Sequence, residues 1–134
     1  MAIKHRTSIQ IRLKDVDAMG HVNNANHITY FEYARIRYFD DLIGDDIDWQ
    51  NEGLILAHQQ ISYKAPIFLK DKITVVTWFV KAGTTSFEMA YEIIRTEKDG
   101  SETLCASGSS VQVCYNYTAA KPIPVPKRWL EKIQ

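Results

Sequence analysis

The sequence predicts an α+β fold in which an antiparallel β-sheet covers one long helix. Three observations lead to this prediction. One stretch, residues 24–43, carries apolar side chains at helical spacing. Several strand-like segments follow it in succession. The turns between some of these segments are short, which implies antiparallel pairing within a single sheet.

The first predicted element is a half-buried strand over residues 8–14. Ile9, Ile11 and Leu13 alternate there with polar residues, and this two-residue period is typical of a strand. Residues 15–24 follow as a polar loop rich in turn-forming side chains.

The long predicted helix spans residues 24–43. Its apolar positions occupy much of the circumference: Ile28, Tyr30, Phe31, Tyr33, Ile36, Tyr38, Phe39, Leu42 and Ile43. A helix that is apolar on several sides is usually enclosed by the rest of the protein. Asparagines at its start can cap it, and Gly44 can end it.

Four strands are predicted after the helix, at residues 54–63, 72–81, 86–97 and 102–116. The Asp99-Gly100 pair predicts a hairpin between the last two. Prolines at 122, 124 and 126 indicate an extended tail, and Pro126 suits the first turn of a short final helix.

Composition narrows the class of protein. The 134 residues suit one domain over 1–134, and equal numbers of acidic and basic side chains, 16 each, argue against a nucleic-acid binder. No apolar run is long enough to span a membrane, so the cytoplasm is the expected location. Cys105 and Cys114 lie in one predicted strand, roughly 30 Å apart, and cannot form a disulfide with each other. No metal-binding pattern occurs, and neither a metal nor another cofactor is expected.

The loop before the helix carries the most specific motif. Residues 17–24 read DAMGHVNN, and the helix after them includes Tyr30, Phe31, Glu32 and Arg35. Residues 63–71 read YKAPIFLKD, and the chain ends in a proline-rich tail. In these features the sequence resembles the hotdog-fold thioesterases, and among them the 4-hydroxybenzoyl-CoA thioesterase family of acyl-CoA thioester hydrolases. The HVNN run also resembles plant acyl-carrier-protein thioesterases.

The resemblance implies a hotdog fold and a homodimer or homotetramer with active sites at the dimer interface. It implies an acyl-CoA or acyl-carrier-protein thioester as substrate, within lipid metabolism. Asp17 would act as nucleophile or general base, and the backbone N–H of Asn24 would polarise the thioester carbonyl. Benzoyl-specific members carry bulky aromatic residues where Asn23 and Asn24 stand here, so an aliphatic acyl group is at least as well supported as an aromatic one.

This chemistry needs few groups. Thioester hydrolysis requires an oxygen nucleophile, or a base that activates water, and positive charge where the oxyanion develops. Asp17 can supply the first, and a helix N-terminus supplies the second because its first N–H groups have no intrahelical acceptor. Asp17 stands about seven residues before the helix, too far for a simple N-cap. Asp15 is the competing carboxylate and is interpreted as structural.

The other candidates have alternative interpretations. The predicted substrate-binding residues are Gly20, His21, Val22, Asn23, His27, His58, Gln59 and Lys64. Gly20 either permits a special backbone conformation or leaves room for the thioester. His21 either contacts the substrate or, as is favoured, fixes the loop. His58 and Gln59 would face the active site across the dimer. Several side chains are weaker candidates, for the acyl pocket or the phosphates of CoA: Tyr30, Tyr33, Lys70, Lys72 and Lys81.

Two other functions stay open. A hotdog-fold hydratase or dehydratase would need an aspartate and a histidine five residues apart, whereas Asp17 and His21 are four apart. A non-catalytic acyl-thioester binding protein would share the fold, because function depends on the site and not on the fold.

Overall fold

The computed structural model describes residues 3–44 and 47–133. Its strands are β1 (His5–Ile9), β2 (Gly53–Tyr63), β3 (Lys72–Ala82), β4 (Ser86–Thr96), β5 (Glu102–Asn116) and β6 (Lys121–Pro122). Its helices are a short 3-10 turn, η1 (Leu13–Asp15), the long α1 (Asn24–Leu42) and the terminal α2 (Lys127–Ile133).

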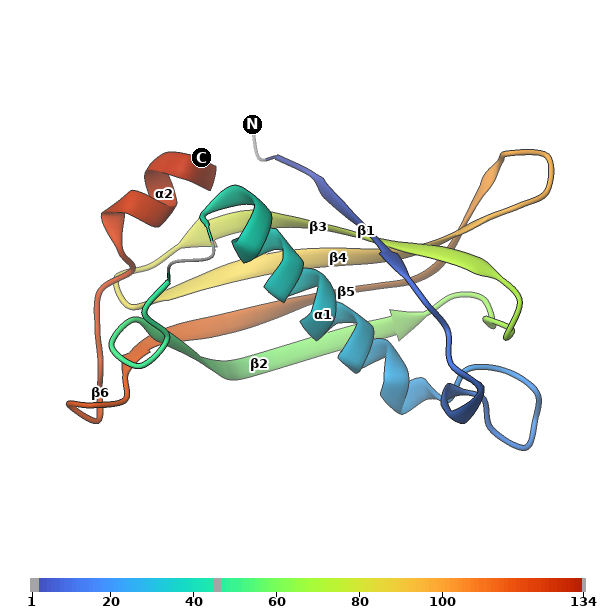
Figure 1. Cartoon of the computed structure of the whole chain (residues 1–134), viewed down its shortest axis with the longest axis horizontal. Helices are drawn as coiled ribbons and strands as arrows, with labels where there is room; N and C mark the ends of the chain where they lie inside the picture. The colour runs from blue at the N-terminus through green and yellow to red at the C-terminus, as the bar shows by residue number, and fades with distance from the viewer. Residues whose placement is uncertain (1–2, 45–46, 134) are drawn as a thin grey trace.

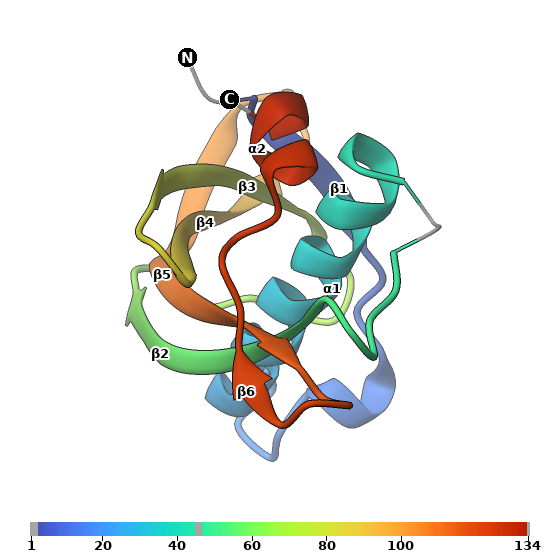
Figure 2. The same cartoon turned by 90° about the vertical axis from the view of Figure 1, so that its left-hand side faces the viewer.

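The strands form one antiparallel sheet in the order β1-β3-β4-β5-β2, and β6 pairs with β5. The sheet curves around α1, which crosses its concave face diagonally (Figures 1 and 2). The predicted sheet around one long helix is therefore confirmed, and the four strands predicted after the helix match β2 to β5 closely.

The predicted strand over residues 8–14 is wrong in its bounds. Strand β1 ends at Ile9, and Leu13 lies in the 3-10 turn and is 77% exposed. The cause is local, because the Asp15 carboxylate accepts a hydrogen bond from the Arg12 N–H at 3.0 Å. The Asp15 N–H also donates to the Arg12 carbonyl, and together these bonds close a turn where the alternation predicts extended chain.

Both ends of α1 form as predicted. The side chain of Asn23 caps the start by accepting from the Ala25 N–H at 2.9 Å. At the other end, Gly44 adopts a positive φ of 129°, and its N–H donates to the Phe39 carbonyl. This conformation favours glycine and stops the helix there.

Helix α1 packs on the sheet through one face. The ring of Phe31 stacks on Tyr91, with the ring centroids 4.5 Å apart, and lies directly over Gly108 of β5. The opposite face is not enclosed, because Tyr33 and Ile36 are each 49% exposed. The prediction of a helix enclosed on several sides is thus wrong for the single chain, whose one sheet covers one face.

A buried polar chain also holds α1 to the sheet. Arg35 donates to the Tyr91 hydroxyl at 3.0 Å, and this hydroxyl lies 2.6 Å from the Ser110 Oγ. Ser110 in turn donates to Gln112. All four side chains are buried, so each hydrogen bond satisfies a group that water does not reach.

Candidate active site

The segment before α1 forms a closed loop whose base is held by backbone hydrogen bonds. The Asp17 N–H donates to the His21 carbonyl at 3.0 Å, and the Asn23 N–H donates to the Asp15 carbonyl at 2.8 Å. Val16 and Val22 pair as an isolated antiparallel bridge between these bonds. The loop therefore presents Asp17 from a short hairpin-like base and not from a free coil.

The backbone of the turn orients the Asp17 carboxylate. The Met19 N–H donates to Asp17 Oδ1 at 2.9 Å, and the Gly20 N–H donates to the Asp17 carbonyl at 3.0 Å. Gly20 has a φ of +89°, which side-chain-bearing residues rarely adopt. This supports the backbone interpretation of Gly20. The Asp17 side chain stays 27% exposed, so the carboxylate can be reached from solvent.

A second segment supports the loop from the β2–β3 connection. The Val22 N–H donates to the Ile67 carbonyl at 2.7 Å, and His21 pairs with Phe68 as an isolated bridge. Val22 is only 1% exposed and belongs to the hydrophobic core. The two motifs that carry the family resemblance, residues 17–24 and 63–71, thus lie side by side.

The start of α1 provides an unpaired donor. Among the residues that the structure describes, the Asn24 N–H has no hydrogen-bond acceptor, because Asn23 caps Ala25 instead. The helix that begins here is 19 residues long, and its aligned peptide dipoles favour negative charge at this end. The Tyr63 hydroxyl donates to the Asn24 carbonyl at 3.1 Å and fixes this first residue against the end of β2.

His27 lies one turn further along α1 and is 3% exposed. Its ring makes an edge-to-face contact with Tyr63, at a centroid distance of 4.9 Å. Burial lowers the pKa of His27 below its ordinary value, so the ring is neutral near pH 7. Its Nδ1 atom has no partner in the described part of the chain.

A hollow of about 260 Å³ lies beside these groups. Its lining includes five predicted site residues: His21, Val22, Asn24, His27 and Lys64. Asp17 adjoins this set through His21, with 4.0 Å between Asp17 Oδ2 and His21 Nδ1. The structure therefore gathers a carboxylate, a helix N-terminus and an amphipathic hollow at one end of the sheet.

Other predicted residues lie apart from this hollow within the single chain. Asn23 serves as the helix cap. His58 and Gln59 sit in mid-β2, opposite Val111 and Ser110 of β5. Their predicted role across a dimer interface stays a prediction. Lys81 lies 3.8 Å from Glu88, which already supplies a counter-charge.

Sequence reasoning assigned no role to Tyr63, although it contacts both Asn24 and His27. No local signal could have found these contacts, because Tyr63 is 39 residues from Asn24 and the fold alone brings them together. Only the YKAPIFLKD motif marked its segment.

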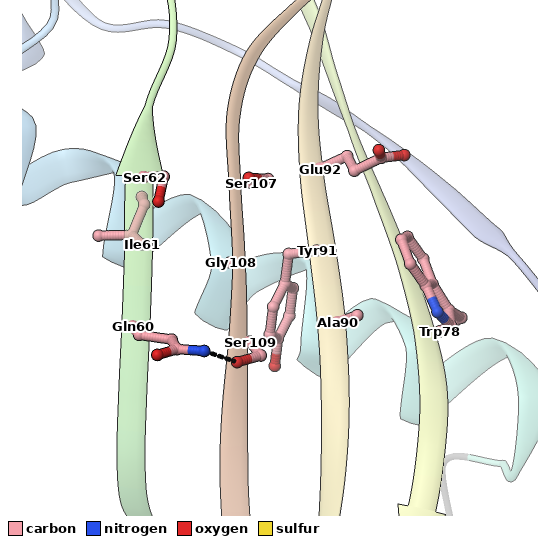
Figure 3. Close-up of a pocket in the computed structure, with 10 residues that line it drawn as sticks. All are labelled: Gln60, Ile61, Ser62, Trp78, Ala90, Tyr91, Glu92, Ser107, Gly108 and Ser109. Atoms are coloured by element: carbon pink, nitrogen blue, oxygen red, sulfur yellow. Dashed lines mark hydrogen bonds between the residues drawn. The ribbon is translucent and has the colours of Figure 1, made fainter.

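A larger hollow, of about 480 Å³, lies on the face of the sheet that points away from α1 (Figure 3). Gln60 and Ser109 are hydrogen-bonded there, and Trp78 and Glu92 line its other side. Its lining includes the Glu92 carboxylate but no helix N-terminus, so it lacks the preorganised donor that an oxyanion needs.

Two kinds of feature are absent from residues 3–44 and 47–133. No group of three or more histidine, cysteine, aspartate and glutamate side chains in these ranges is arranged to hold a metal ion. No helix within them has both the length and the apolar character to cross a membrane.

An antiparallel sheet around one helix, with a carboxylate loop at the positive end of that helix, is the architecture of a hotdog-fold thioester hydrolase. The model of the thioesterase-like superfamily matches residues 11–133. The chain belongs to this superfamily.

Individual relatives agree with this assignment to the thioesterase-like superfamily. The chain is 24% identical over 132 residues to the long-chain acyl-CoA thioesterase FadM of Escherichia coli (strain K12), and the match covers 96% of both chains. It is 32% identical to a thioesterase from Thermus thermophilus solved with coenzyme A and zinc; the TM-score is 0.82, with 100% of this chain and 99% of the other covered.

The fold also matches a 4-hydroxybenzoyl-CoA thioesterase variant solved with 4-hydroxybenzoyl-CoA. The TM-score is 0.89 at 17% identity, covering 98% of this chain and 99% of the other. This match extends the likeness in fold to the branch of the family that the sequence motifs resemble.

Proposed function

We propose that this protein hydrolyses acyl-CoA thioesters, or the matching acyl-carrier-protein thioesters, to a free acid and a thiol. Asp17 is the reacting carboxylate, and the Asn24 N–H stabilises the oxyanion. The single observation that carries this assignment is the unpaired Asn24 N–H at the start of α1, beside the loop that orients Asp17. The acyl-CoA specificity of FadM and the coenzyme A held by the Thermus protein support the substrate class.

The groups allow a simple reaction. The Asn24 N–H donates to the thioester oxygen as negative charge develops on it, aided by the dipole of α1. Asp17 either attacks the carbonyl carbon, giving an anhydride that water then cleaves, or removes a proton from an attacking water. In both routes the C–S bond breaks and the sulfur leaves as a thiolate. No strong general acid is needed, because a thiolate is a good leaving group.

Substitution of Asp17 tests the assignment. Asp17→Asn keeps the shape and the acceptor for the Met19 N–H but removes the charge. We expect kcat to fall by about a thousandfold or more on a panel of acyl-CoAs, measured by release of free thiol. Asp48→Asn is a matched control, because Asp48 orients a surface turn through the same kind of backbone contact. Near-native turnover of Asp17→Asn would exclude Asp17 as the reacting group.

The hollow also suggests how the rest of the substrate binds. Lys64 lines it, and Lys70 and Lys72 flank the same β2–β3 connection with exposed side chains. We infer that these cations contact the phosphates of CoA. Lys64→Ala should raise KM severalfold with little change in kcat, because the phosphates lie far from the reacting carbonyl.

The site is further proposed to need two copies of the chain. Strand β2 is an edge strand with exposed Leu56 and Tyr63, and α1 exposes Ile28 and Ile36 on its open face. A second copy that covers these side chains would bring its own His58 and Gln59 to the interface. On dilution, we expect the activity per chain to fall in step with dissociation of the two copies. Sedimentation measures the dissociation, and release of free thiol measures the activity. A fully active monomer would contradict this arrangement.

A further inference from the structure

Asp15 lies two residues before Asp17, yet its side chain is turned inward and only 6% exposed. Its Oδ2 atom accepts two hydrogen bonds, one from the Arg12 N–H at 3.0 Å and one from the Tyr30 hydroxyl at 2.8 Å. Tyr30 belongs to the second turn of α1 and is 5% exposed. The carboxylate therefore ties the segment before the Asp17 loop to the body of the helix.

The backbone of Asp15 makes a second pair of contacts. Its carbonyl accepts from the Asn23 N–H at 2.8 Å and from the Asn26 side-chain amide at 2.9 Å. Asn23 is the residue immediately before Asn24, whose N–H is the proposed oxyanion donor. One residue thus contacts the start of α1 through its carbonyl and the second turn of α1 through its carboxylate.

These contacts place Asp15 between the two reacting groups. Asp17 follows two residues later, just past the antiparallel bridge between Val16 and Val22. On the other side of this bridge, Asn24 directly follows Asn23, whose N–H binds the Asp15 carbonyl. A rotation of Asp15 would displace Asp17 and the helix start together. Burial and the neighbouring carboxylate raise the pKa of Tyr30, so its hydroxyl keeps its proton and remains a donor.

We propose that Asp15 is a positioning residue for thioester hydrolysis, holding the Asp17 loop against the start of α1 through its bond to Tyr30. This role rests on the proposed function of Asp17 and Asn24. It applies equally whether the Asp17 of one copy works with its own helix start or with that of a second copy, because Asp15 fixes both groups within its own chain. Misplacement of a reacting group by about 1 Å can cost a hundredfold in rate.

Three variants test the role. Asp15→Ala removes the acceptor, and we expect kcat to fall by about tenfold to a hundredfold with KM within about threefold of native. Asp15→Asn keeps an oxygen that can accept both hydrogen bonds, and it should recover most of the lost kcat. Tyr30→Phe removes one of the two donors and should lower kcat by a smaller factor. If Asp15→Ala does not fold, native kcat in Tyr30→Phe overturns the proposal.

Asp99→Ala is the matched control. The Asp99 carboxylate, in the β4–β5 turn, also accepts one backbone N–H and one hydroxyl, both from Ser101. Loss of these bonds should reduce the free energy of unfolding and leave kcat unchanged per folded molecule. An Asp15→Ala protein whose kcat per folded molecule is likewise native would overturn the positioning role.

A double variant separates this proposal from the assignment of Asp17. In the Asp17→Asn background, Asp15→Ala should lower the residual kcat by a clearly smaller factor than in the native background, since only the Asn24 N–H is then left to position. A full additional loss would overturn the role. Near-native turnover of Asp17→Asn itself would overturn the proposed function and this role with it. An inactive Asp17→Asn beside a fully active Asp15→Ala would overturn the positioning role alone.

Discussion

The His21 imidazole and the Asp17 carboxylate lie 4.0 Å apart, from Nδ1 to Oδ2, which is beyond hydrogen-bonding distance. The atom that does hold the carboxylate is the backbone nitrogen of Met19, at 2.9 Å. The same imidazole nitrogen lies 3.4 Å from the Val22 carbonyl. His21 therefore fits the interpretation of a residue that fixes the loop better than that of a group that tunes Asp17.

We accordingly expect His21→Gln to lower kcat/KM by less than about tenfold, because the backbone bonds that orient Asp17 remain. Steady-state thiol release on one acyl-CoA, with Asp17→Asn measured beside it, checks this. A loss as large as that of Asp17→Asn would instead place His21 in the proton transfer.

Gly20 and Gly100 form a matched pair for testing the loop. They have φ values of +89° and +86°, and a Cβ atom on either would meet no atom within 4 Å. Alanine at either position should reduce the free energy of unfolding by a similar amount, about 1 kcal/mol, through backbone strain alone. Urea unfolding measures that reduction. Only Gly20→Ala should also lower kcat, because only its turn holds Asp17. An equal kcat in both variants would contradict the role of this turn.

The repetitive elements could be predicted from the sequence because their signals are local. The period of α1, the Asp99-Gly100 turn and the apolar runs of β3 each lie within a few residues. The bounds of β1 could not be predicted in this way. The hydrogen bond from the Arg12 N–H to the Asp15 carboxylate ends the strand, although the alternation of apolar and polar residues continues to Leu13. The exposed face of α1 was also missed, since periodicity reports apolar positions and not what covers them.

The candidate site likewise has features that local sequence signals indicate and contacts that only the fold creates. Asp17, the cap at Asn23 and the helix start follow from one motif and from helix-end chemistry. The contacts of Tyr63 with Asn24 and of Tyr30 with Asp15 depend on how separate segments pack, so no spacing in the sequence indicates them. The interpretation of Asp15 as structural follows from its position, whereas its partners become visible only in the fold.

Buried His27 predicts a pH dependence of stability. Burial lowers its pKa in the folded state below the ordinary value of 6.5. Between these two pKa values the unfolded chain binds more protons than the folded chain, so the free energy of unfolding rises with pH through this window. The contribution of neutral His27 to the free energy of unfolding is complete above about pH 6.5 and is lost as the pH falls below that value.

Urea unfolding at several pH values between about 4.5 and 7.5 measures this slope. His27→Phe removes the titrating ring and the unpartnered Nδ1, and it should flatten the slope relative to the native chain. Tyr38→Phe is the control, because it removes another buried polar atom of α1 but no group that titrates in this pH range, so the slope should stay unchanged. An unaltered slope in His27→Phe would mean that other groups carry the dependence.

Gly108 of β5 lies directly against the Phe31 ring of α1. A Cβ atom there would meet the Gln60 carbonyl oxygen and would lie 2.7 Å from the Phe31 ring. Neither neighbour can move easily, since Gln60 is paired in β2 and Phe31 is fully buried. Gly108→Ala should therefore reduce the free energy of unfolding by about 3 kcal/mol. Gly83→Ala is the control, because its nearest contact would be an ordinary 3.5 Å to Ser86 Oγ. We expect Gly83→Ala to change the free energy of unfolding by less than about 1 kcal/mol in the same urea titration. Equal losses in the two variants would show that α1 can move away from the sheet without a loss of stability.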